Sequence, residues 1–212
     1  LCFSLTTNAQ SKENPMIEAV QKFAVSTEHA DKFGALPVQS SNGRMIPVNT
    51  FSSEILRKLH KSDKIGSLNS DQFLLCFLAM LYMWMRVPLI AVSNSELAGF
   101  YNLTEGQSAY IEMFDSNGNY KLQEGVEGAY NKMPNERSRF DKDLLKLDEQ
   151  VNIMHQLING QMLNLFPKED DPNHTWYASG DDLSVFAGKD SMFVSRVMDW
   201  YISEVQTALK SA

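Results

Sequence analysis

The sequence has little cysteine and none of the short motifs that mark the common enzyme families. Its two cysteines, Cys2 and Cys76, lie far apart. Without a Cys-x-x-Cys pair a thioredoxin-like redox function is unsupported, and without a Cys-x-x-Cys-His segment the chain is not itself a c-type cytochrome. The Gly-x-Ser-x-Gly, His-Glu-x-x-His, P-loop and dinucleotide-binding glycine patterns are also missing. These absences make a hydrolase or a metal enzyme the weakest of the functional alternatives.

A long hydrophobic run and a block of like charge are missing as well. The apolar run from Phe73 to Met85 is shorter than the ~20 residues that span a bilayer, and Arg86 and Pro88 follow it at once. We therefore expect a buried helix there. The net charge is −7 with no basic cluster, which argues against a nucleic-acid partner. With 212 residues, 43% of them apolar, the chain can form a substantial globular core.

The first ten residues differ from the rest of the chain. The segment Thr7-Asn8-Ala9 resembles the small-residue end of a secretory signal. We interpret residues 1–10 as the remnant of a signal or of a membrane segment. Residues 11–212 are predicted to form one extracytoplasmic helical domain, a fragment of a longer membrane protein.

The remaining pattern predicts a mainly α fold, a single-domain multi-helix bundle with one short β-hairpin near residues 36–48. Asn42-Gly43 favours a tight turn, because both residues tolerate a positive φ. An amphipathic helix follows, which Thr50 can cap. The sequence predicts further helices from Pro15, from the capping pair Asn69 and Gln72 over residues 73–85, after Ser93, after Thr104, over residues 135–165 and over residues 190–210.

Candidate ligands for a metal or a haem iron are few. The four histidines are dispersed, at positions 29, 60, 155 and 174. His155 lies beside apolar Met154, and His174 lies in a loop with Glu169, Asp170 and Asp171. For both histidines an ordinary structural role is the stronger interpretation, and they are kept only as weak ligand candidates.

Several short segments occur in an order that resembles a known family. The first is the segment with Arg44, Pro47, Thr50, Glu54 and Arg57. The others are Leu68-Asn69-x-Asp71-Gln72, Trp84 with Val87-Pro88-Leu89-Ile90, Lys146-Leu147-Asp148-Glu149-x-Val151-Asn152, Phe166-Pro167, Asp171-Pro172-Asn173-His174-x-Trp176 and Trp200-Tyr201. Together they are similar to the extracytoplasmic domain of System II cytochrome c biogenesis proteins, and more narrowly to the fused form that joins ResB-like and CcsA-like halves.

The resemblance implies a function for the longer protein. It implies a haem-handling protein on the periplasmic side of the inner membrane, which attaches haem to apocytochrome c as a synthetase. This chain is expected to assist partner docking or assembly without catalysis of its own. Its expected partners are apocytochrome c and the membrane-embedded remainder of the same protein, with contact to the membrane by tethering only. Arg44, Pro47, Thr50, Glu54 and Arg57 are the candidate structural and docking motif.

Two expectations about function stay open at this point. The alternative to the maturation function is a generic helical protein-interaction module of the cell envelope. No cofactor is expected in this fragment, and haem is expected to bind it weakly or not at all. The reason is that an axial ligand must face a large apolar slot, whereas the histidines fall near predicted helix ends or in an acidic loop and the methionines fall at predicted core positions.

Overall fold

The chain folds into a mainly helical structure, as the sequence predicts. The computed structural model describes residues 14–211, the last three by their backbone alone, so the predicted remnant at residues 1–10 lies outside the described residues. The α-helices of this part are α1 (Pro15–Gln21), α2 (Thr27–Gly34), α3 (Val48–His60), α4 (Ser70–Ala79), α5 (Leu81–Trp84), α6 (Ser95–Tyr101), α7 (Gln123–Tyr130), α8 (Arg139–Ile158) and α9 (Lys189–Ser211). Two 3₁₀ turns, η1 (Tyr110–Met113) and η2 (Leu183–Val185), accompany them.

The predicted hairpin is present, and the described residues contain three more antiparallel pairs of strands. Gly43 has a φ of 80°, which glycine adopts without strain, at the turn between the first two strands. The sequence predicted only one of these four pairs, because strands of two to five residues are too short to show a clear alternating pattern. The pairs are β1 (Pro37–Gln39) with β2 (Met45–Pro47), β3 (Lys64–Ile65) with β4 (Leu68–Asn69), β5 (Pro88–Val92) with β6 (Gly106–Ala109), and β7 (Phe166–Pro167) with β8 (Trp176–Tyr177).

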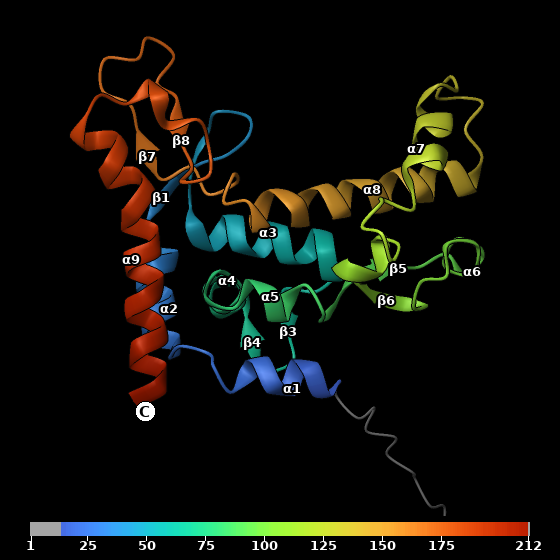
Figure 1. Cartoon of the computed structure of the whole chain (residues 1–212), viewed down its shortest axis with the longest axis horizontal. Helices are drawn as coiled ribbons and strands as arrows, with labels where there is room; N and C mark the ends of the chain where they lie inside the picture. The colour runs from blue at the N-terminus through green and yellow to red at the C-terminus, as the bar shows by residue number, and fades with distance from the viewer. Residues whose placement is uncertain (1–13, 212) are drawn as a thin grey trace, which may run out of the picture.

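Helices α3 and α4 lie at the centre of the fold. Figure 1 shows α8 crossing above α3, with α4 and α5 below it, while α9 runs along one side next to α2. Strands β5 and β6 and helices α6 and α7 occupy the opposite end. No helix in residues 14–211 combines the length and the apolar character that crossing a membrane requires.

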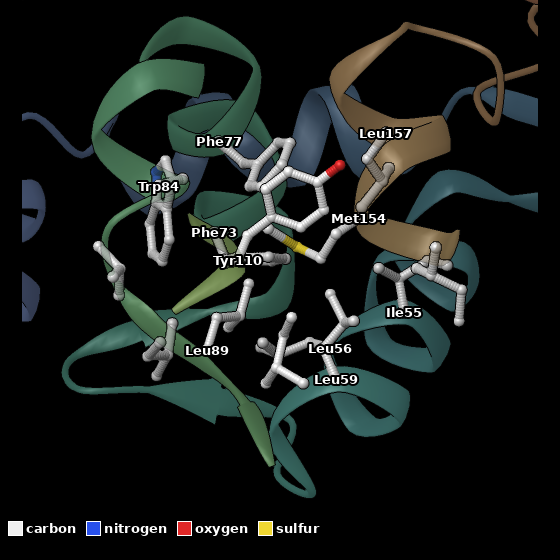
Figure 2. Packing of buried hydrophobic residues seen from close by; sticks show 14 of the residues in the cluster. Ile55, Leu56, Leu59, Phe73, Phe77, Trp84, Leu89, Tyr110, Met154 and Leu157 are labelled. Carbon is white, nitrogen blue, oxygen red and sulfur yellow. The ribbon is translucent and has the colours of Figure 1, made fainter. Parts of the chain in front are cut away.

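The core forms around the aromatic residues of α4 and α5. Phe73 and Trp84 are fully buried and meet edge to face, with ring centroids 5.0 Å apart, and Phe77 packs beside them (Figure 2). The prediction of one buried helix over residues 73–85 was wrong in two respects, the first being that Tyr82 is 80% exposed. The helix breaks at Met80 (φ −138°, ψ 47°), and α5 follows as a separate turn.

The capping predictions had mixed outcomes. Asn69 and Gln72 form the expected reciprocal cap of α4. Thr50 does not cap α3, because that helix already begins at Val48. The Thr50 hydroxyl donates a hydrogen bond to the Asn49 side chain instead. No helix begins at Thr104, whose backbone N–H and hydroxyl both donate to the Glu112 carboxylate. For α6 the cap is Asn94 and not the predicted Ser93, and α8 begins after Ser138 and ends at Ile158, well inside the predicted range.

Helix α9 packs on the fold with only part of the face that its sequence predicts. The apolar spacing in residues 190–210 predicts that Phe193, Val197, Tyr201, Val205 and Ala208 face inward, but the Phe193 side chain is 62% exposed and Ala208 is exposed. The face that packs on the fold contains Val194, Met198, Tyr201 and Val205. As a result, α9 turns Tyr201 toward α2 and leaves a row of large apolar side chains outside.

Candidate functional site

A large apolar groove lies between α2 and α9. It has a volume of about 530 Å³, within the ~300–1,000 Å³ range of small-molecule sites. Apart from His29, Lys32, Tyr201 and the thioether of Met198, its lining is hydrocarbon or aromatic. We call it the α2–α9 groove; its walls are His29, Lys32 and Phe33 of α2, Leu36 and Pro37, Leu165 and Phe166, Trp176, and Val197, Met198, Trp200 and Tyr201 of α9.

The wall between the two helices is a stack of rings. The Tyr201 ring lies nearly parallel to those of His29 and Phe33, with centroid distances of 6.0 and 5.7 Å. A hydrogen bond of 2.8 Å joins the Tyr201 hydroxyl to His29 Nε2. Burial raises the pKa of the Tyr201 phenol, which therefore stays protonated at neutral pH. In the tautomer with a proton on Nδ1, the phenol donates to the free lone pair of Nε2.

The hairpin closes the groove from the other side. The side chain of Gln39, in β1, accepts a hydrogen bond from the Trp176 backbone N–H (2.8 Å) and donates to the His174 carbonyl oxygen (2.9 Å). The Gln39 backbone also pairs with Asn164. One glutamine thus fixes the acidic 166–176 segment against the hairpin, and Trp176 is held at the wall of the groove.

The outer rim of the groove exposes aromatic and sulfur side chains. Trp200 is 64% exposed, and Phe193 and Met192 follow it along the outer face of α9. Beside them, Lys189 and Arg196 line a second cavity of about 390 Å³ that shares Trp200 with the groove. Large apolar groups next to cations are typical of surfaces that bind a partner.

The predicted docking motif lies on the hairpin and α3. Arg44, Glu54 and Arg57 are exposed, Thr50 is half-buried, and Pro47 pairs with Pro37 of the groove wall before α3 begins. The charges of Arg44 and Glu54 are compatible with an ion pair between them, but within residues 14–211 neither residue forms one. Within the motif, Pro47 helps to position the groove wall by pairing with Pro37. The charged groups of Arg44, Glu54 and Arg57 stay accessible.

The two histidines kept as ligand candidates lie outside the groove. His155 is exposed on α8, where Nδ1 bonds the Tyr110 hydroxyl (3.2 Å) and Nε2 bonds the Asn159 amide (3.0 Å). His174 is exposed in a turn with a φ of 51°. In the described part of the chain, no three His, Cys, Asp or Glu side chains gather as a metal-binding group.

Sequence reasoning did not select His29. It occurs in a short polar segment, and the pattern gives no sign that Tyr201, 172 positions later, reaches its ring. By contrast, the resemblance includes Phe166, Trp176, Trp200 and Tyr201, and all four line the groove. The only signal in the sequence for this site was therefore the set of aromatic residues in those late segments.

The described residues thus form a mainly helical domain with an open groove lined by aromatic and aliphatic side chains. No known family model matches the chain. It is, however, similar to Protein NrfI of Wolinella succinogenes, with 36% identity over 169 residues. The alignment covers 78% of this chain but only 18% of that relative, so the chain corresponds to a small part of a much longer protein.

Proposed function

We propose that this chain is an extracytoplasmic domain of a cytochrome c maturation protein and that it helps to hold that protein's partners in place. The observation that carries the proposal is the 36% identity to NrfI over 169 residues. This similarity, together with the resemblance of the short segments to System II cytochrome c biogenesis proteins, suggests involvement in cytochrome c maturation.

The arrangement of the similar segments supports a shared binding surface. The hairpin with Arg44 and Pro47 belongs to the first segment of the resemblance, and Trp176 and Trp200 belong to the last ones. These segments are far apart in the sequence, yet Gln39 bonds the hairpin to the backbone of Trp176, and Trp176 and Trp200 line one groove. A surface assembled from the first and last segments of the resemblance is more readily explained by partner binding than by core packing.

Exposed side chains on the hairpin, α3 and α9 have the chemistry of docking residues. Arg44 and Arg57 are exposed without an ion-pair partner among the described residues, and Trp200 is largely exposed. Arginine and tryptophan contribute most often to the central contacts of protein interfaces. The partners that we propose are apocytochrome c and the membrane-embedded remainder of the same protein, on the periplasmic side of the inner membrane.

Catalysis is assigned to the longer protein. Thioether formation requires haem vinyl groups, free thiols and an axially held iron. The thiol of Cys76 is buried, and burial raises its pKa to about 11, so it is a core residue without nucleophilic character at neutral pH. We therefore propose that this chain binds and positions the partners, while haem attachment occurs elsewhere in the same protein.

The experiment is a binding measurement with matched variants. An apocytochrome peptide that contains Cys-x-x-Cys-His is titrated into the purified chain by isothermal calorimetry. We expect saturable binding that is weakened at least fivefold by the double substitution Arg44→Ala and Arg57→Ala. The control is Arg139→Ala, which removes an exposed arginine at the far end of α8. No binding, or equal loss in the control, would contradict the docking function.

A further inference from the structure

The α2–α9 groove combines aromatic walls with two side chains that ligate iron. His29 and Met198 both line it, one from each helix. Imidazole and thioether groups are the axial ligands of haem in many haem proteins. The expectation that haem binds this chain weakly or not at all assumed that the histidines lie outside any large apolar slot, and His29 contradicts that assumption.

We propose that the α2–α9 groove is a haem-contact site, with His29 Nε2 as a ligand of the iron. The inference rests on the proposed function, in which haem is the cargo of the longer protein. The groove volume of about 530 Å³ lies in the range of sites that bind ligands as large as a cofactor. Phe33, Trp176 and Trp200 present flat apolar surfaces, against which a conjugated ring packs well.

The state of His29 fits a ligand that is free to exchange. Its Nε2 is engaged only by the Tyr201 hydroxyl among the contacts in the described structure. That bond holds the imidazole ring in place and uses the same lone pair that would bind iron. Iron therefore has to displace the Tyr201 hydroxyl from Nε2, and the Tyr201 ring, which stacks on His29 and Phe33, has to turn aside. This cost weakens the complex, as a site for cargo in transit requires.

The other three histidines are placed differently. His155 is exposed and has both ring nitrogens engaged, and His174 lies in an exposed turn. His60 is half-buried, and its Nδ1 bonds the Gln107 amide. None of the three lines the α2–α9 groove. A specific haem complex should therefore depend on His29 alone.

The test is a titration of iron protoporphyrin into the purified chain, followed by the Soret band. We expect a saturable one-to-one complex with a shifted Soret band. His29→Ala should weaken it at least tenfold, whereas His155→Ala should leave it unchanged. Circular dichroism confirms that each variant is folded. Metal-free protoporphyrin should bind more weakly than the iron form, and its affinity should not change in His29→Ala, because it has no iron to ligate.

Two further variants keep the proposal testable if His29→Ala does not fold. Trp200→Ala alters an exposed side chain at the rim and should weaken haem binding without loss of structure. Tyr201→Phe frees the Nε2 lone pair and should tighten iron protoporphyrin binding about fivefold, the equivalent of ~1 kcal/mol for one hydrogen bond.

The absence of a saturable complex, or a Soret band that His29→Ala leaves unchanged, would overturn the haem site. An unaltered affinity in Trp200→Ala would exclude this groove as its location. The peptide titration described above, made on the same samples, separates the two proposals. Peptide binding without haem binding preserves the docking function and rejects the haem site alone.

Discussion

The Ser52 hydroxyl donates a hydrogen bond to the Asp71 carboxylate in the buried interface between α3 and α4. Ser52 is completely buried and Asp71 is 7% exposed. Gly34 of α2 packs so closely on the same carboxylate that a Cβ atom there would collide with it. One acidic side chain therefore joins three helices, and α2, the helix that carries His29, is positioned by this contact.

Removal of the Ser52 hydroxyl should destabilise the fold. Ser52→Ala leaves a buried carboxylate oxygen without its donor, and we expect the free energy of unfolding to fall by ~1–3 kcal/mol. Urea denaturation followed by circular dichroism measures the change. The matched control is Ser53→Ala on the same helix, at a partly exposed position, with an expected change within ~0.5 kcal/mol. Equal effects of the two substitutions would show that the Ser52 bond contributes nothing specific.

Asp71 should give the stability a characteristic pH dependence. Burial raises the pKa of its carboxyl group above the ordinary value of 3.8, Asp31 raises it further, and the Ser52 hydrogen bond offsets part of this rise. A raised folded-state pKa means that the protonated form is favoured by folding. The wild type should therefore lose stability, relative to Asp71→Asn, as the pH rises from about 3.8 through the folded-state pKa. Urea denaturation at several pH values measures the free energy of unfolding of both proteins. A constant difference between the wild type and Asp71→Asn across this pH range would contradict the prediction.

The core of α4 should be more sensitive than its rim. Leu74 is fully buried, whereas Leu78 on the same helix is only partly buried. Leu74→Ala should lower the free energy of unfolding by ~2–5 kcal/mol, because it removes buried hydrocarbon and leaves a cavity. Leu78→Ala should lower the free energy of unfolding by clearly less. The melting temperatures of the two variants provide the comparison, and a larger loss for Leu78 would place the core elsewhere.

Arg44 separates a structural contribution from a docking contribution. It is exposed and forms no ion pair in the described part of the chain. Arg44→Ala should therefore change the free energy of unfolding by less than ~0.5 kcal/mol, while cytochrome maturation in cells falls. A lower melting temperature with unchanged maturation would assign Arg44 a structural role instead.

Local signals predicted the elements that depend on a few neighbouring residues. The Asn42-Gly43 turn and the reciprocal cap of Asn69 and Gln72 are both present. Failures came where tertiary contacts outweigh local preference. Met80 interrupts an apolar run that reads as one helix, and Thr104 bonds Glu112 instead of starting a helix.

The candidate site was harder to predict than the fold. The bond between His29 and Tyr201 joins the first and last parts of the described chain, and no spacing rule relates such distant residues. The apolar spacing of α9 correctly placed Tyr201 and Val205 on the buried face, but it also placed Phe193 there, and that side chain is exposed. Family resemblance did identify Trp176 and Trp200, although it gave no sign that they share a groove with a histidine.

The most direct test of a function in cytochrome c maturation is a gene deletion with complementation. Cells that lack the protein containing this chain are grown under conditions in which c-type cytochromes are made. Covalently bound haem is then measured by haem staining after denaturing electrophoresis. We predict that haem-stained cytochromes are lost and that the intact gene restores them. We also predict that a gene with Arg44→Ala, Arg57→Ala and Trp200→Ala restores them only in part. Unchanged haem staining in the deletion strain would contradict the proposed function.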